Sequence, residues 1–133
     1  MKPPLQTTEG KKRRPRVLVI DDSEVDREVM QEILSKAGCD VHVLPSPIGA
    51  SKVARELNVD VVVVDQNLPS LDGNKLVALL RKVGGLQDLQ VILVSGASEV
   101  DVEPLASQAN VDAFISKRHL HDQLAQTVQR LAR

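Results

Sequence analysis

Five short apolar runs along the chain predict buried β-strands. They lie at residues 17–20, 41–44, 61–64, 91–94 and 113–115. Each run is short enough for a strand and lacks the alternation of polar and apolar side chains that marks a half-exposed strand. We therefore expect a sheet that is covered by apolar side chains on both faces.

Helical patterns fill the intervals between these runs. Apolar residues recur every four positions over residues 24–37, where Ser23, with Asp26 three residues later, fits an N-cap and Gly38 fits the helix end. Further helices are predicted at residues 48–57, 74–83, 99–109 and 119–132. Pro104 interrupts the helix predicted at residues 99–109.

This regular alternation of strand and helix predicts an α/β fold. Strands that alternate with helices of this length form a parallel sheet with helices on both faces. Because the crossovers are right-handed, the favoured arrangement is a flavodoxin-like (βα)5 doubly wound sheet, with five parallel strands in the order 2-1-3-4-5.

Charge and composition separate the first residues from the rest. Residues 1–14 are mostly polar and predict a flexible basic leader, whereas residues 15–133 suit one domain. Residues 1–16 hold six basic side chains and one acidic one, and residues 17–133 hold 11 basic and 17 acidic ones. The basic run at residues 11–14 is short and has no aromatic neighbours, so we expect a solvated leader and no nucleic-acid partner.

The cysteine count and hydropathy bear on the compartment. Cys39 is the single cysteine of the sequence, which excludes an intrachain disulfide and fits a reducing environment. No apolar run approaches the roughly 18 residues that a membrane-spanning helix needs. We therefore expect a cytoplasmic protein that is not inserted into a membrane.

Chemically capable side chains end several of the predicted strands. The first strand is followed by Asp21 and Asp22, the third by Asp65, the fourth by Ser95, and the fifth by Ser116 and Lys117. Ligands bind at the carboxyl edge of such a sheet, where these residues should converge. Carboxylates in one cleft repel each other and need a cation, and their hard oxygen atoms suit Mg²⁺.

This set of residues fits phosphoryl transfer to Asp65. With Mg²⁺ held by Asp22 and Asp65, the Asp65 carboxylate would attack a phosphoryl group and become an aspartyl phosphate. Lys117 would hold one phosphoryl oxygen as a point charge, and the Ser95 hydroxyl would donate a hydrogen bond to another. Taken singly, each residue has an ordinary alternative role in a turn, a helix cap or the surface. Their coincidence at successive strand ends favours the chemical interpretation.

The motifs around these residues resemble the receiver domain of bacterial response regulators, of the CheY-like superfamily, over residues 16–133. Residues 17–22 resemble its first strand and acidic pair, residues 65–73 its phosphorylation loop, residues 95–97 its hydroxyl segment, and residues 109–117 the stretch before its lysine. The spacings also agree, with 43 residues from Asp22 to Asp65, 30 more to Ser95 and 22 more to Lys117.

The resemblance implies a role for each matched residue. Asp65 would accept a phosphoryl group from a histidine kinase or a phosphotransfer protein. The metal site would consist of the carboxylates of Asp22 and Asp65, the backbone carbonyl of Asn67, and Asp21 acting through water. Ser95 and Phe114, the single aromatic residue, would form a switch that shifts the surface of helix 99–109, strand 113–115 and helix 119–132 toward a downstream protein target.

Three positions depart from the family pattern. Arg118 stands where the family usually has proline, and a cis bond to a non-proline residue costs about 2.5–4 kcal/mol, so we expect a trans or strained loop after Lys117. Pro104 predicts that its helix begins late. Asn110 replaces a glycine and tolerates the left-handed conformation expected there.

The sequence thus favours a stand-alone receiver, a monomer or weak dimer, that signals through protein contacts, because no output domain follows Arg133. One alternative is a pseudo-receiver that binds partners independently of phosphorylation. Another is an enzyme with an aspartyl intermediate, but such phosphatases usually place a second carboxylate where this chain has Asn67. We therefore expect no enzyme activity beyond self-phosphorylation and self-dephosphorylation.

Overall fold

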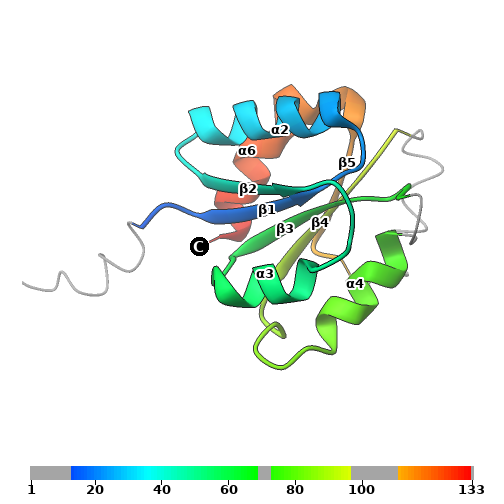
Figure 1. The fold of residues 1–133 in the computed structure, drawn as a ribbon. Helices are drawn as coiled ribbons and strands as arrows, with labels where there is room; N and C mark the ends of the chain where they lie inside the picture. The colour runs from blue at the N-terminus through cyan, green and yellow to red at the C-terminus, as the bar shows by residue number, and fades with distance from the viewer. Residues whose placement is uncertain (1–12, 69–72, 97–110, 133) are drawn as a thin grey trace, which may run out of the picture.

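The computed structural model describes residues 13–68, 73–96 and 111–132 and shows a five-stranded sheet with helices on both faces (Figure 1). In chain order the elements are β1 (Arg16–Ile20), α2 (Glu24–Lys36), β2 (Asp40–Leu44), α3 (Ala50–Glu56), β3 (Val61–Asp65), α4 (Gly73–Arg81), β4 (Gln90–Ser95), β5 (Ala113–Ser116), the 3₁₀ helix η1 (Lys117–His119) and α6 (Leu120–Leu131). All five predicted strands are present, each within one or two residues of the predicted bounds.

The strand order creates the edge at which the site forms. The strands are parallel and lie in the order β2-β1-β3-β4-β5, which confirms the predicted flavodoxin-like topology. β1 pairs with β2 on one side and with β3 on the other, so the direction of winding changes between β1 and β3. In open α/β sheets the crevice for ligands lies at such a switch point, beyond the carboxyl ends of the strands.

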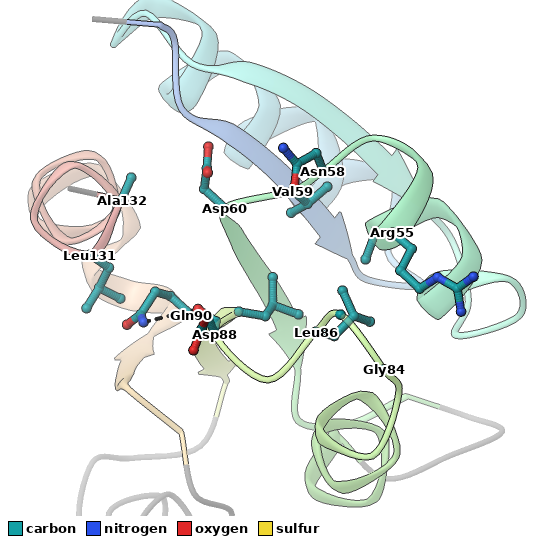
Figure 2. A pocket seen from close by; sticks show the side chains of 13 residues that line it. Arg55, Asn58, Val59, Asp60, Gly84, Leu86, Asp88, Gln90, Leu131 and Ala132 are labelled. Carbon is teal, nitrogen blue, oxygen red and sulfur yellow. Dashed lines mark hydrogen bonds between the residues drawn. The ribbon is translucent and has the colours of Figure 1, made fainter. Parts of the chain in front are cut away.

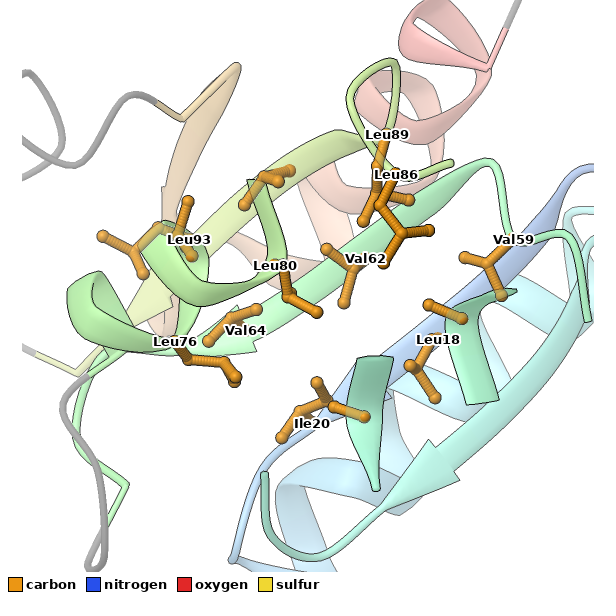
Figure 3. Packing of buried hydrophobic residues seen from close by; sticks show 14 of the residues in the cluster. Leu18, Ile20, Val59, Val62, Val64, Leu76, Leu80, Leu86, Leu89 and Leu93 are labelled. Atoms are coloured by element: carbon orange, nitrogen blue, oxygen red, sulfur yellow. The ribbon is translucent and has the colours of Figure 1, made fainter. Parts of the chain in front are cut away.

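Two apolar clusters cover the two faces of the sheet, because successive residues of a strand point to opposite sides. On one face Leu18, Val62 and Leu93 pack with side chains of α3 and α4 (Figure 3). On the other face Val17, Val63 and Ile92 pack with side chains of α2 and α6. The sequence prediction of strands without polar alternation is therefore confirmed, and the sheet forms a rigid support for the residues at its ends.

The described helices differ slightly from the predicted ones at their ends. Ser23 caps α2 as predicted, with its hydroxyl accepting a hydrogen bond from the Asp26 N–H at 3.2 Å. The helix predicted at residues 48–57 is shorter, because Gly49 precedes Ala50 in the left-handed conformation with a φ of 81°. The predicted helix at residues 99–109, with Pro104, and Asn110 lie outside the described residues.

The first described residues contact the amino edge of the sheet. The Arg13 guanidinium lies 2.7 Å from an Asp60 carboxylate oxygen, and the Arg14 side chain donates to the Gly38 carbonyl at 3.2 Å. The division into a leader at residues 1–14 and a domain at residues 15–133 stays a prediction, because residues 1–12 lie outside the described part. Within the described ranges, each helix is too short or too polar to cross a bilayer.

Candidate functional site

The carboxyl edge of the sheet brings together the acidic residues that the sequence pointed to. Asp21 follows β1 directly, and Asp65 is the last residue of the neighbouring β3. Carboxylate oxygens of Asp21, Asp22 and Asp65 all lie within 4.8 Å of one another. Asp21 and Asp65 are buried, whereas Asp22 is exposed. Three carboxylates at this separation form a group that could hold a metal ion, and their oxygen donors fit Mg²⁺.

The two buried carboxylates are held in the same way. The Asp21 Oδ1 atom accepts a hydrogen bond from the Ser23 N–H at 2.9 Å, and the Asp65 Oδ1 atom accepts one from the Asn67 N–H at 3.1 Å. Each aspartate therefore bonds the backbone two residues ahead, the arrangement of an Asx turn. This arrangement fixes both side chains and leaves their Oδ2 atoms facing Lys117.

Lys117 is the cation of the acidic group. Its Nζ atom lies 2.9 Å from Asp21 Oδ2, 3.4 Å from Asp65 Oδ2 and 2.7 Å from Asp26 Oδ2. Burial by itself would lower the pKa of Lys117, but the hydrogen bond to Asp26, together with the nearby carboxylates of Asp21 and Asp65, outweighs burial and raises it. Lys117 is therefore fully charged at neutral pH.

Beyond Lys117, where Arg118 replaces the usual proline, the backbone forms a turn with trans peptide bonds. Residues 117–119 form the 3₁₀ helix η1, in which the Ser116 hydroxyl accepts a hydrogen bond from the Arg118 N–H at 3.3 Å. No cis peptide bond occurs in the described ranges, so the Lys117–Arg118 bond is trans. Lys117 reaches both buried aspartates from this trans backbone.

The Asp65 carboxylate has a raised pKa. Burial raises its pKa, and the neighbouring Asp21 charge raises it further, while the Asn67 N–H and Lys117 lower it. The net direction is upward, because the carboxylate has lost much of its contact with water. An anion that is only partly compensated is a suitable ligand for an additional cation.

Ser95 and Phe114 lie on the two strands beyond Asp65. Ser95 is the last residue of β4 and is fully buried, and it is in register with Ser116 of β5. Phe114, opposite Leu93, is partly buried and packs against the cluster beneath α3 and α4. Their proximity along the β4–β5 edge fits the predicted switch, which stays a prediction.

Two features of the site escaped the sequence analysis. Asp26 was assigned to the helix cap, but its carboxylate pairs with Lys117, and only its N–H takes part in the cap. The available signal was its place in the first turn of the helix, shortly after the acidic pair Asp21 and Asp22. The close approach of Gly73 was also missed: a Cβ atom there would lie 2.6 Å from the Asp65 carbonyl oxygen.

A cavity of about 490 Å³ lies at the opposite edge of the sheet (Figure 2). Its lining includes Asp60, just before β3, Gln90 at the start of β4, and Leu131 at the end of α6. None of the carboxylates that surround Lys117 lines it. The cavity is therefore separate from the site, and the residues with chemical potential gather at the carboxyl edge.

Comparisons with known proteins agree with this geometry. The family model for the response regulator receiver domain matches residues 17–129. The chain is 31% identical over 119 residues to the transcriptional regulatory protein PrrA of Mycobacterium leprae, covering 90% of this chain and 50% of PrrA. It is 29% identical over 119 residues to the two-component response regulator ORR1 of Oryza sativa subsp. japonica, covering 82% of this chain and 52% of ORR1.

A solved structure gives the same result. The receiver domain of Francisella response regulator 1452 has a TM-score of 0.77 and 27% sequence identity, over 90% of this chain and 97% of that domain. By contrast, the chain spans about half the length of the two curated relatives. The similarity to these two relatives therefore covers only about half of each protein.

Proposed function

This chain belongs to the response regulator receiver domain family of two-component systems, and we propose that it accepts a phosphoryl group on Asp65 in a Mg²⁺-dependent reaction. One observation carries the proposal: the Lys117 ammonium group meets the carboxylates of Asp21 and Asp65 at the switch point of the sheet. A buried acceptor anion, a fixed cation and an exposed third carboxylate are the parts that phosphoryl transfer to a carboxylate requires.

In the proposed reaction, Asp65 attacks the phosphorus atom of the donor. The bond from the Asp65 carboxylate to phosphorus forms as the bond to the donor breaks, and the bonding electrons leave with the donor. Asp22, Asp65 and the Asn67 carbonyl, with Asp21 acting through water, would hold Mg²⁺, which would neutralise part of the phosphoryl charge. Lys117, whose Nζ atom lies 3.4 Å from Asp65 Oδ2, would then contact a phosphoryl oxygen.

The hydroxyl of Ser95 would donate a hydrogen bond to another phosphoryl oxygen. Its movement toward Asp65 would leave space into which the Phe114 ring turns, since Phe114 is only partly buried on the neighbouring strand. Such a change shifts the population of two packing arrangements. The signal would then reach a downstream protein through a face that includes β5 and α6.

The phosphoryl donor would be a histidine kinase or a phosphotransfer protein, as the family membership suggests. The chain would act as a switch without enzyme activity beyond its own phosphorylation and dephosphorylation. The acidic charge of residues 17–133 disfavours a nucleic-acid partner, since nucleic-acid-binding surfaces are basic.

NMR spectroscopy of the ¹⁵N-labelled chain tests this proposal against a phosphorylation-independent pseudo-receiver. Mg²⁺ should shift the backbone amide resonances of Asp22, Asp65 and Asn67, and acetyl phosphate should cause a second set of shifts that reverts as the phosphoryl group hydrolyses. A pseudo-receiver would show no shift around Asp22 and Asp65 on either addition. In the Asp65→Asn variant the second set of shifts should be absent.

A further inference from the structure

The shortest contact of the Lys117 ammonium group is with Asp26, which lies outside the acidic group at the strand ends. Its Nζ atom is 2.7 Å from Asp26 Oδ2, compared with 2.9 Å for Asp21 and 3.4 Å for Asp65. An ammonium group has three N–H donors and no acceptor. In this structure the ammonium group donates to Asp26, while Asp21 and Asp65 lie beside it as ion-pair partners, so a phosphoryl oxygen next to Asp65 would compete with Asp26 for the ammonium group.

A rigid element holds Asp26 in this position. It lies in the first turn of α2, and its N–H is fixed by the Ser23 hydroxyl at the helix cap. The same turn is tied to the acidic loop, because the Arg27 guanidinium donates to the Asp21 carbonyl at 2.9 Å. Because these hydrogen bonds fix the first turn of α2, the carboxylate of Asp26 is held within reach of Lys117.

The three contacts of Lys117 differ in how readily they can break. The Asp21 side chain is fully buried and that of Asp65 is 5% exposed, so neither can recover its hydration when Lys117 moves away. The Asp26 side chain is 33% exposed, and water can replace the ammonium group there. Asp26 is therefore the carboxylate that gives up Lys117 at the lowest cost.

From these observations we propose that Asp26 is a positioning residue that holds Lys117 in the unphosphorylated state and competes with the phosphoryl group for it. The inference rests on the proposed phosphorylation of Asp65. When the phosphoryl group arrives, Lys117 exchanges its contact with Asp26 for one with a phosphoryl oxygen and keeps its contact with Asp21. The Asp26 contact thereby lowers the stability of the phosphorylated state and sets how much of the protein is in that state.

Three variants separate the contact from a general effect of charge. Asp26→Asn removes the competing charge with little change of shape, and Asp26→Glu keeps the charge. Glu24→Gln removes the same charge from the same exposed helical turn, and Glu24 makes no ion pair with any of the residues that the structure describes. All three are compared with the unaltered chain for binding of beryllofluoride, a phosphoryl mimic, at saturating Mg²⁺.

We expect Asp26→Asn to bind beryllofluoride roughly three- to five-fold more tightly, the upper part of the range for an exposed ion pair. Asp26→Glu and Glu24→Gln should stay within about two-fold of the unaltered chain. The ¹⁵N resonance of Lys117 Nζ gives a second readout, because a purely structural role of Asp26 would not move it. It should shift on beryllofluoride binding in the unaltered chain, and Asp26→Asn should shift it before any mimic is added.

The other outcomes overturn the inference in distinguishable ways. Equal tightening in Asp26→Asn and Glu24→Gln would show a general charge effect and no competition at Lys117. Weaker binding in Asp26→Asn would show that Asp26 supports the bound state. If the unaltered chain does not bind beryllofluoride at all, the proposed phosphorylation fails and the inference fails with it. If the chain binds but the variants match it, the inference alone fails.

Discussion

The Lys117 ammonium group lies 2.7 Å from the carboxylate of Asp26, although 91 residues separate them in the chain. This contact joins the residue after β5 to the first turn of α2, the helix that covers the same face of the sheet as α6. Together with the contacts to Asp21 and Asp65, it makes Lys117 the charge that compensates the acidic edge. The stability of that edge should therefore depend on this one side chain.

Substitution of Lys117 by Met should destabilise the metal-free protein. Loss of the cation leaves the buried Asp21 and Asp65 carboxylates uncompensated, and removal of one member of a buried ion pair costs about 3–5 kcal/mol. Because Lys117 is itself 20% exposed, we expect the free energy of unfolding to fall by about 3 kcal/mol in urea with a chelator present. Addition of Mg²⁺ should recover part of the loss.

Lys36→Met serves as the control for this substitution. The Lys36 side chain is 77% exposed and pairs with Glu32 at the surface, where such pairs contribute no more than about 1 kcal/mol. Equal midpoints for the two variants would contradict the role assigned to Lys117.

Asp65→Asn should stabilise the metal-free protein at neutral pH. Burial raises the pKa of Asp65 in the folded state above its usual value of 3.8, so the folded protein binds more protons than the unfolded chain just above that value. The contribution of Asp65 to stability is then fully present below pH 3.8 and is lost as the pH rises through the folded pKa. The stability difference between variant and unaltered chain should grow from pH 4 to pH 7.

Chemical denaturation at a series of pH values, in the presence of a chelator, measures this difference. The exposed Asp88 provides the matched control, since Asp88→Asn removes the same charge at the other edge of the sheet. A difference between Asp65→Asn and the unaltered chain that stays constant with pH would contradict the raised pKa of Asp65.

Gly73→Ala should damage the site through the backbone. A Cβ atom at Gly73 would lie 2.6 Å from the Asp65 carbonyl oxygen and 2.9 Å from the Gln66 Cα atom, and neither is the flexible end of a side chain. Overpacking of this kind costs about 1–3 kcal/mol, which a thermal unfolding experiment resolves. Gly84→Ala, where an added Cβ meets nothing within 4 Å, should leave the melting temperature within a degree or two. Similar losses of stability in the two variants would contradict the close approach of Gly73 to the Asp65 backbone.

Asp22→Asn should separate metal binding from stability. Asp22 is exposed, so its substitution should not lower the metal-free melting temperature, but it removes one negative charge from the three-carboxylate group. Loss of a residue that supports a metal site commonly costs about ten-fold or more in affinity, so the rise in melting temperature with Mg²⁺ should need at least about ten-fold more Mg²⁺. An unchanged Mg²⁺ dependence would place the metal elsewhere.

Much of this site follows from the sequence, for a physical reason. Parallel strands end at one edge, so Asp21, Asp65 and Lys117 had to converge once the strands and their order were recognised. The contact of Asp26 with Lys117 was not found, because its position in the helix cap already explained the residue. The approach of Gly73 to Asp65 depends on the path of a loop, which no local pattern encodes. The shortened start of α3 likewise depends on the left-handed conformation of Gly49.

Phosphorylation of Asp65 is tested most directly by the intact mass of the purified chain after incubation with acetyl phosphate. With Mg²⁺ present, the chain should gain the mass of one phosphoryl group, and the gain should disappear with a chelator and in the Asp65→Asn variant. The Asp60→Asn variant, altered at the other edge of the sheet, should still gain it. An unchanged mass of the unaltered chain, or an equal gain in Asp65→Asn, would contradict the assignment of Asp65 as the phosphoryl acceptor.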